Sequence, residues 1–317
     1  MDFVGVDVGK RDLHVALLQE DHLAQKSVSN TLHGFEQLLK WFTNRKVQDL
    51  HICLEATGTY GVALAEFLHD AGYRLSVVNP GQIKAFGRSE LVRTKTDRVD
   101  AALIARFCRA NQPASWAPPP LAIRELRALI RRRETLTTMI SAEKNRLDPG
   151  TTPGVRRSIR SVLRNLQAEL KALEGEIDRH LDQHPDLREQ IDRIDEIPGF
   201  GNLTAMKVFA ETNGFTVCRT SRQIVAFAGL NPKLYESGSI RRRGRISKIG
   251  NAALRKALYY AALSAKNHSA YFQPFVQRLA AAGKRPKVII TAVMRKLLVL
   301  AFAISKSNRR FDLGYCA

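Results

Sequence analysis

The chain has 317 residues, of which 44% are apolar, and its 50 lysines and arginines against 30 acids give a net charge of +20 at pH 7. The apolar content excludes a wholly disordered chain, and ordinary numbers of glycine, proline and cysteine exclude collagen-like and disulfide-scaffold proteins. The excess of positive charge makes a polyanion, most commonly nucleic acid, the expected partner. At roughly 100–200 residues per domain, the length predicts two or three domains.

Residues 1–115 alternate between short β-rich stretches and helical ones. Strands are expected at 3–8, 13–18, 24–30, 51–54 and 74–78, and helices around 35–42, 60–71 and 97–108. Three leading antiparallel strands followed by alternating helices and strands are the order of a ribonuclease H-like mixed sheet. A doubly wound dinucleotide-binding fold has a different order. The predicted class of this part is therefore α/β.

Prolines at 113 and 118–120 mark a linker, and residues 116–190 are expected to be helical. One helix is predicted over 121–147 and is ended by a breaker at 148–154. Beyond it, apolar residues recur at heptad spacing from Ile159 to Leu181. An antiparallel hairpin within one chain fits this seam, and so does a coiled coil between protomers. The sequence leaves both open.

Residues 191–317 are predicted to form a mainly helical and strongly basic C-terminal domain. From residue 237 onward there are ten arginines and seven lysines against a single acid, Asp312. A solvated face would mix both signs of charge, so this stretch reads as a phosphate-facing surface. The longest apolar run, 288–304, is interrupted by Arg295 and Lys296. We therefore expect no membrane span and no leader peptide, and we expect a cytoplasmic protein that acts at the nucleoid.

Neither the four cysteines nor the eight histidines show a spacing that we assign to a metal site. Four carboxylates, in contrast, stand at positions that suggest a metal site. Asp7 lies within a strand among valines, where a charge is costly without a partner, and Glu55 ends the fourth strand. Asp97 and Asp100 are three residues apart and so project from one face of a helix. Taken singly, each acid has a plainer explanation as a surface charge, a helix cap or the start of a phosphate-binding turn.

In a ribonuclease H-like sheet these positions converge, and four converging acids repel one another unless divalent cations neutralise them. Mg²⁺ is the hard, oxygen-seeking choice, and it would polarise a phosphate and activate a hydroxyl. The set of four acids therefore predicts a Mg²⁺ site.

Residues 197–201 read IPGFG between helical flanks and resemble a helix-hairpin-helix turn. There the backbone N–H groups of Gly199 and Gly201, with the positive end of the next helix, would grip a phosphate without reading sequence. A tight turn that binds nothing fits the same residues.

Residues 235–248 read YESGSIRRRGRISK. A serine among arginines could attack a phosphodiester while the guanidinium groups stabilise the added negative charge. A basic loop that only binds phosphates fits as well, and the chemistry does not choose among Ser237, Ser239 and Ser247. The cations expected at the nucleic acid are Arg241, Arg242, Arg243, Arg245 and Lys248.

Six motifs together resemble the IS110-family transposases, and the resemblance covers nearly the whole chain in the right order. The acidic motifs are residues 4–7, 54–60 and 96–101, and those of the C-terminal transposase domain are residues 197–201, 227–230 and 235–239. The resemblance implies a RuvC-like domain at 1–115, a helical coiled-coil linker at 116–190 and a C-terminal transposase domain at 191–317. Carried over position by position, it implies catalytic and metal-binding acids at Asp7, Glu55, Asp97 and Asp100, and a catalytic serine at Ser237.

The implied reaction is RNA-guided exchange of DNA strands through a covalent phosphoserine, at a composite centre built from different protomers. A structured guide (bridge) RNA would select donor and target DNA by base pairing, and dimers would assemble into a tetramer. Base pairing would then supply specificity, which leaves the protein to hold backbones and shape.

Three other functions fit parts of the sequence. A RuvC-like Mg²⁺-dependent endonuclease would hydrolyse DNA at the four acids without a covalent intermediate. A sugar kinase of the actin-like type also opens with a strand ending in Asp-x-Gly, but it leaves the basic tail unexplained. A non-catalytic RNA-binding protein would bind RNA without exchanging strands.

Overall fold

A computed structural model gives the fold of the chain. It describes residues 1–317 except 46, 48, 57, 59, 149, 238, 239, 313 and 315–317, and of residues 234–237 and 240–245 it describes the backbone alone. The chain divides into two compact units, Met1–Pro118 and Pro119–Ala317. The predicted division into three parts at 115 and 190 stays a prediction.

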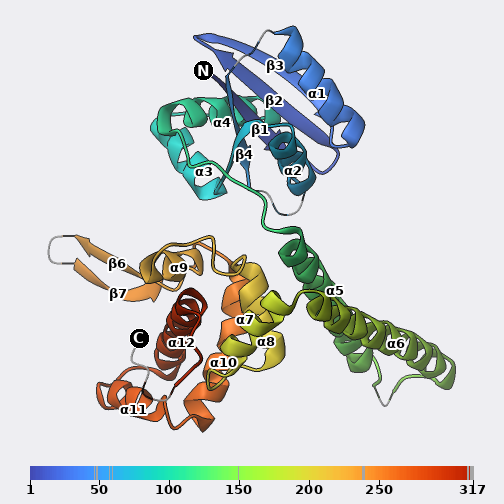
Figure 1. The fold of residues 1–317 in the computed structure, drawn as a ribbon, viewed down its shortest axis with the longest axis vertical. Helices are drawn as coiled ribbons and strands as arrows, with labels where there is room; N and C mark the ends of the chain where they lie inside the picture. The colour runs from blue at the N-terminus through green and yellow to red at the C-terminus, as the bar shows by residue number, and fades with distance from the viewer. Residues whose placement is uncertain are drawn as a thin grey trace. The chain divides into compact units, whose positions relative to one another are not determined.

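The first unit is built on a five-stranded sheet in the order β3-β2-β1-β4-β5 (Figure 1). The strands are β1 (Asp2–Val8), β2 (Asp12–Gln19), β3 (His22–Ser29), β4 (Leu50–Glu55) and β5 (Arg74–Val78). The first three strands pair antiparallel, whereas β1–β4 and β4–β5 pair parallel. The mixed sheet and the antiparallel pairing of its first three strands agree with the predicted ribonuclease H-like α/β class.

Helices cover both faces of this sheet. They are α1 (Leu32–Asn44), α2 (Val62–Asp70), α3 (Pro80–Ser89) and α4 (Asp97–Asn111). Alternate residues of β1 face opposite sides: Val4 and Val6 pack in the core with α1 and α2, whereas Phe3 packs with α3 and α4. Helix α3 was not predicted, because it begins with Pro80-Gly81 and buries only Ile83 and Gly87.

Helix α4 lies unusually close to the centre of the sheet, and Gly5 is the reason. A Cβ atom at Gly5 would lie 2.2 Å from both the carbonyl oxygen of Ala101 and the amide nitrogen of Ala105. Only glycine therefore allows α4 to cross β1 at this height. The first turn of α4 is thereby held over the carboxyl ends of β1 and β4.

The second unit consists of helices and a two-stranded sheet. Its elements are α5 (Leu121–Asn145), α6 (Pro153–Gln183), α7 (Pro185–Asp195), α8 (Asn202–Glu211), α9 (Ser221–Phe227), β6 (Pro232–Ser237), β7 (Ile240–Ile246), α10 (Ala252–His268), α11 (Gln273–Ala281) and α12 (Pro286–Ser307). Its core is formed by α7–α10, α12 and the near ends of α5 and α6. Most of the predicted loop at 235–248 is instead the antiparallel pair β6–β7. These strands were not predicted, because an arginine-rich segment lacks the apolar alternation that signals a strand.

Helices α5 and α6 form an antiparallel hairpin, and the heptad seam is covered within the chain (Figure 1). At the free end Ile159 and Leu163 pack on Ile140 of α5, and at the base Ile177 and Leu181 pack with α5 in the main core. Arg133 and Glu174 form an ion pair across the hairpin, with 2.6 Å between Nη2 and Oε1.

Helix α12 is long and apolar enough to cross a membrane by length and composition alone, which the sequence reading did not expect. Val293, Leu297 and Ala301 are nevertheless fully buried against the neighbouring helices. Lys296, which interrupts the run, stacks on Tyr271, with 5.0 Å from Nζ to the ring centroid. Burial in this core accounts for the apolar composition of α12 without a membrane.

Candidate catalytic site and nucleic-acid surfaces

Asp7 and Glu55 lie at the same level on neighbouring parallel strands. The register of β1 and β4 pairs Val6 with Leu54, and the two acids follow directly in each strand. Asp7 shares a face of β1 with Phe3 and Gly5, and this is the face that α4 covers. Because Glu55 stands two residues after Cys53, which packs in the same core as α4, it shares that face as well.

Asp97 and Asp100 lie in the first turn of α4. Thr96 caps this turn, its hydroxyl oxygen accepting from the amide of Val99 at 3.3 Å. The side chain of Gln25 on β3 donates to the carbonyl oxygen of Arg98 at 2.8 Å, which ties the turn to the sheet. Acids in a first turn also complement the positive end of the helix dipole.

The charges of these residues act on one another. Burial raises the pKa of Asp7, and the carboxylates of Asp100 and Asp97 raise it further, with His14 opposing the rise. Burial also raises the pKa of Glu55, and Asp7 and Asp100 add to it while Lys95 opposes. Carboxyl groups from three separate stretches of the sequence are therefore close enough in the fold to raise the pKa values of Asp7 and Glu55.

His14 belongs to the same cluster, although the sequence analysis set it aside. It is paired with Asp7 across the antiparallel strands β1 and β2. Its Nε2 lies 3.3 Å from Oδ2 of Asp97, and its Nδ1 lies 2.9 Å from the hydroxyl of Ser27. With both ring nitrogens engaged, His14 holds Asp97 toward the sheet. The place of His14 beside Asp7 could have been predicted from the hairpin, since strands joined through residues 9–11 pair residue 14 with residue 7.

This donor set fits a divalent cation. Carboxylate oxygens are the ligands of hard ions, and a cation would remove the repulsion that raises the pKa values of Asp7 and Glu55. Asp7, Glu55, Asp97 and Asp100 would hold it, and His14 would orient Asp97. The metal-binding and catalytic roles of these residues stay predictions.

The IPGFG turn joins α7 to α8 as the sequence predicts, but Gly199 has a steric explanation. Its φ is +102°, and a Cβ there would lie 2.5 Å from the Cβ of Ala265 on α10. Conformation and packing alone thus require glycine at 199. Gly201 is the exposed N-cap of α8, and a Cβ there would meet nothing. Of the two, Gly201 is the more exposed.

Ser237 ends strand β6 and is paired with Ile240 of β7 in the backbone register. The side chains of Ser237, Arg241, Arg242, Arg243 and Arg245 lie outside the described residues, as does Ser239. Ser247 is described, and its hydroxyl donates to Oδ1 of Asn231 at 2.8 Å. Lys248 is exposed, with φ at +55°. Ser247 therefore has a structural partner, which argues against it as a nucleophile.

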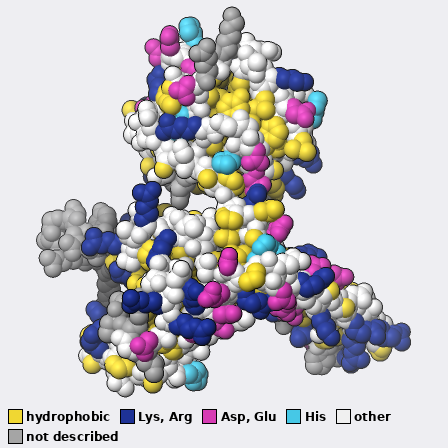
Figure 2. Space-filling model, in the orientation of Figure 1, with side chains coloured by type: hydrophobic (Ala, Val, Ile, Leu, Met, Phe, Trp, Pro, Cys, Tyr) yellow, Lys and Arg dark blue, Asp and Glu magenta, His cyan; other side chains and the backbone are white. Residues whose placement is uncertain are grey.

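A further basic surface lies on the free part of the α5–α6 hairpin, where lysines and arginines gather (Figure 2). Arg157, Arg160 and Arg164 of α6 line one open hollow there together with Gln167. No acid occurs between residues 149 and 168, so nothing in the sequence of this stretch offsets the charge. The sequence analysis missed this surface because it placed the positive charge in the last quarter of the chain.

Two family models match the chain, and both describe transposases. One, a transposase model of the IS110 DEDD type, matches residues 4–149, and the other, for the transposase IS116/IS110/IS902 family, matches residues 191–277. Together they account for most of the chain. It belongs to the IS110 family of transposases. As a member of that family it is an enzyme that acts on DNA.

Relatives of this IS110-family chain carry related names. The pilin gene-inverting proteins of Moraxella bovis and Moraxella lacunata are each 29% identical over 314 residues, which is 98% of this chain and 97% of theirs. The transposase for insertion sequence element IS1111A of Coxiella burnetii is 39% identical over 80 residues, 25% of this chain and 22% of that protein. Among solved structures, T. thermophilus RuvC in complex with Holliday junction substrate aligns with a TM-score of 0.29 and 11% identity, over 37% of this chain and 99% of that one.

The matched segments of the IS110-family chain contain the residues described above. Asp7, Glu55, Asp97 and Asp100 fall within the first matched segment, and His14 falls there as well. The IPGFG turn and Ser237 fall within the second.

Proposed function

We propose that this transposase cuts and rejoins DNA through a covalent phosphoserine at Ser237, with Mg²⁺ held by the four carboxylates and with a structured guide RNA selecting the DNA. One observation carries the proposal: three separate elements, β1, β4 and α4, bring Asp7, Glu55, Asp97 and Asp100 close enough to raise the pKa values of Asp7 and Glu55. A solvated acidic surface would spread such charges apart. Their concentration is typical of a site that binds cations and phosphates.

Strand exchange is favoured over hydrolysis by the relatives. A protein named for inverting a pilin gene must rejoin the DNA that it cuts, since an inverted segment has two new junctions. A nuclease that only hydrolyses phosphodiesters leaves ends and no junctions. A covalent phosphoserine accounts for the difference between rejoining and hydrolysis, because it keeps the energy of the broken phosphodiester bond.

The chemistry balances without a further reactant. The Ser237 hydroxyl oxygen attacks phosphorus and loses its proton, one P–O bond to deoxyribose breaks, and the sugar oxygen leaves as a hydroxyl. A hydroxyl of another strand then attacks the phosphoserine, which re-forms the phosphodiester and frees the serine. A divalent cation bound at the acids would polarise the phosphate and stabilise the added charge. His14 would hold Asp97 in place throughout.

The basic surfaces support RNA and DNA binding. Arg157, Arg160 and Arg164 on α6 and the arginines of β7 offer guanidinium groups suited to phosphate oxygens. Such surfaces bind backbones and shape, and a paired RNA would then supply the specificity. We further propose that dimers of the chain assemble into a tetramer on the DNA, as the family resemblance implies.

Trapping the intermediate tests the function directly. The protein is incubated with Mg²⁺, a duplex spanning the junction of its own element, and the flanking transcript. We expect a protein–DNA adduct that survives a denaturing gel and maps by mass spectrometry to Ser237, and we expect none without the transcript. Ser237→Ala should remove both adduct and recombinant product, whereas Ser239→Ala and Ser247→Ala should keep them. Cleavage that persists in Ser237→Ala without an adduct would support the hydrolytic nuclease.

Replacing Arg241, Arg242 and Arg243 together by alanine should weaken nucleic-acid binding and flatten its dependence on salt. If each arginine neutralises one phosphate of a duplex, the slope of log K against log salt should fall in magnitude by about 2 to 3. Filter binding over a salt series measures it. The matched control replaces the exposed cations Lys284, Arg285 and Lys287, which removes the same charge elsewhere. An equal change in both variants would show that net charge alone matters and that β7 does not contact the phosphates.

A further inference from the structure

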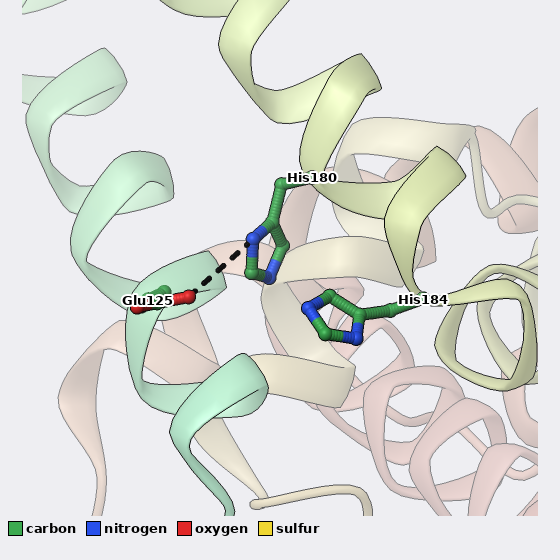
Figure 3. Close-up of side chains that lie close together, drawn as sticks. All are labelled: Glu125, His180 and His184. Atoms are coloured by element: carbon green, nitrogen blue, oxygen red, sulfur yellow. Dashed lines mark ion pairs between the residues drawn. The ribbon is translucent and has the colours of Figure 1, made fainter.

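Two histidines and a glutamate converge at the base of the α5–α6 hairpin, in a part of the fold that the proposed reaction does not use. Glu125 lies near the start of α5, His180 lies in the last turn of α6, and His184 stands at the break between α6 and α7 (Figure 3). One ligand atom from each side chain lies within 4.8 Å of the other two. Donors around a tetrahedral ion are about 3.4 Å apart, so small rotamer changes bring all three onto one ion.

The orientation of His180 follows from its contacts. The side chain is 8% exposed, and its Nε2 lies 2.8 Å from the carbonyl oxygen of Ala122. Because a carbonyl only accepts, Nε2 donates to it. Nδ1 is then directed at Oε2 of Glu125, at 3.7 Å. A cation placed between Nδ1 and Oε2 would be bound by both side chains.

This arrangement is the one that metal-binding histidines usually have. Their other ring nitrogen donates to a carbonyl or a carboxylate, which fixes the tautomer and the ring orientation. The competing arrangement, a doubly protonated His180 paired with Glu125, leaves His184 unexplained. The two imidazole rings lie 4.7 Å apart between centroids, so both can reach one ion.

His180 and His184 are four residues apart, so the end of α6 presents both on one side. His184 directly follows α6 as its C-cap, with φ at −129° and ψ at 71°, and Pro185 starts α7 directly after it. The chain direction at the break is therefore what sets the position of the second imidazole. The sequence analysis missed the spacing because the third donor, Glu125, lies 55 residues earlier on another helix.

We propose that Glu125, His180 and His184 bind Zn²⁺. Two imidazoles and one carboxylate with a fourth position open to solvent are a zinc donor set, whereas Mg²⁺ prefers oxygen ligands alone. The ion joins α5 to the α6–α7 break and fixes the direction in which the hairpin leaves the helical core. The proposed ion holds these helices together, and it takes no part in the transfer of phosphate.

The test is a zinc titration of the full-length protein after removal of metals. Because the acidic cluster also offers carboxylates, the titration uses Asp7→Asn protein as the parent. We expect one equivalent of Zn²⁺ bound with micromolar or tighter affinity by competition with a coloured chelator, and a rise in melting temperature with Zn²⁺. Adding His184→Ala or Glu125→Gln should each weaken binding by at least about 100-fold, since changes even to outer-shell partners cost 10–100-fold. Adding His33→Ala, which removes an exposed histidine of α1, should change nothing.

His184 and Glu125 are chosen because they are more exposed than His180, and circular dichroism of each variant checks that it folds. Cobalt gives an independent reading, since Co²⁺ held by two imidazoles and a carboxylate in tetrahedral geometry absorbs visible light strongly, and His184→Ala should lose that band. The proposal is wrong if folded parent protein takes up no Zn²⁺ in this range. It is equally wrong if uptake survives both His184→Ala and Glu125→Gln.

Discussion

Asp7→Asn should reduce strand cleavage by about 10²–10³-fold or more while raising the melting temperature of the metal-free protein. The loss follows because the variant removes one ligand charge from a site where the added phosphate charge must be stabilised. The gain in stability follows because the carboxylate is partly buried and is repelled by Asp100 and Asp97. An amide carries no charge and can donate to the remaining acids. Divalent cations should stabilise the wild type more than the variant.

The dependence of stability on pH checks the same repulsion. The pKa of Asp7 and of Glu55 is raised in the folded state, so the folded chain binds protons more readily than the unfolded one. The metal-free protein should therefore gain stability as pH falls through the raised values toward the ordinary values of 3.8 and 4.5, and should lose it as pH rises. Thermal melts in chelator across this range measure the slope, which Asp7→Asn should reduce. A variant that cleaves normally, or melts at the wild-type temperature in chelator at neutral pH, contradicts the assignment.

Gly5→Ala should destabilise the first unit by about 3 kcal/mol or more, because the new methyl group would overlap backbone atoms of α4 that no rotamer change can move. For a unit of this size the melting temperature should fall by roughly 10–20 °C. Whatever folded protein remains should bind divalent cations more weakly, since α4 carries two of the four acids. Calorimetry with and without Mg²⁺ measures both effects.

Gly61→Ala is the matched control for this change. A Cβ at Gly61 meets only the side chain of Val8, at 3.5 Å, which is ordinary contact. The backbone there is helical, with φ at −90°. We expect its stability to stay close to that of the wild type. Equal melting temperatures for the two variants would mean that α4 does not approach β1 as closely as the structure has it.

The sheet of the first unit could be predicted because its strands have strong local signals. Valines and other β-formers make β1 and β2 distinct, and the short connection at 9–11 leaves only an antiparallel pair. The positions of the acids on these elements then follow from the known geometry of such sheets. Their repulsion was predicted, but the close approach of α4 to the sheet was not, because it is decided by the absence of a side chain at Gly5.

The elements and contacts that were missed depend on long-range packing. A heptad seam buries the same residues in a hairpin and in a coiled coil between chains. The spacing of Ile159 and Leu163 therefore does not show whether they pack on the same chain or on another. Strand β7 carries arginines where a half-buried strand carries apolar residues. The triad at Glu125 needs two helices to come together in space. For the seam and the triad, the deciding partner is remote in the chain.

The length of α6 would turn a small change of angle at its end, the pivot, into a large displacement of its far end. Arg157 lies 27 residues before His184 along one unbroken helix, which at 1.5 Å per residue is about 40 Å. A change of 10° in the angle at the α6–α7 break would swing the arginines at the free end through about 7 Å, roughly the distance between neighbouring phosphates on one strand of DNA. A small change of angle at the pivot is enough to bring these guanidinium groups to a different nucleotide.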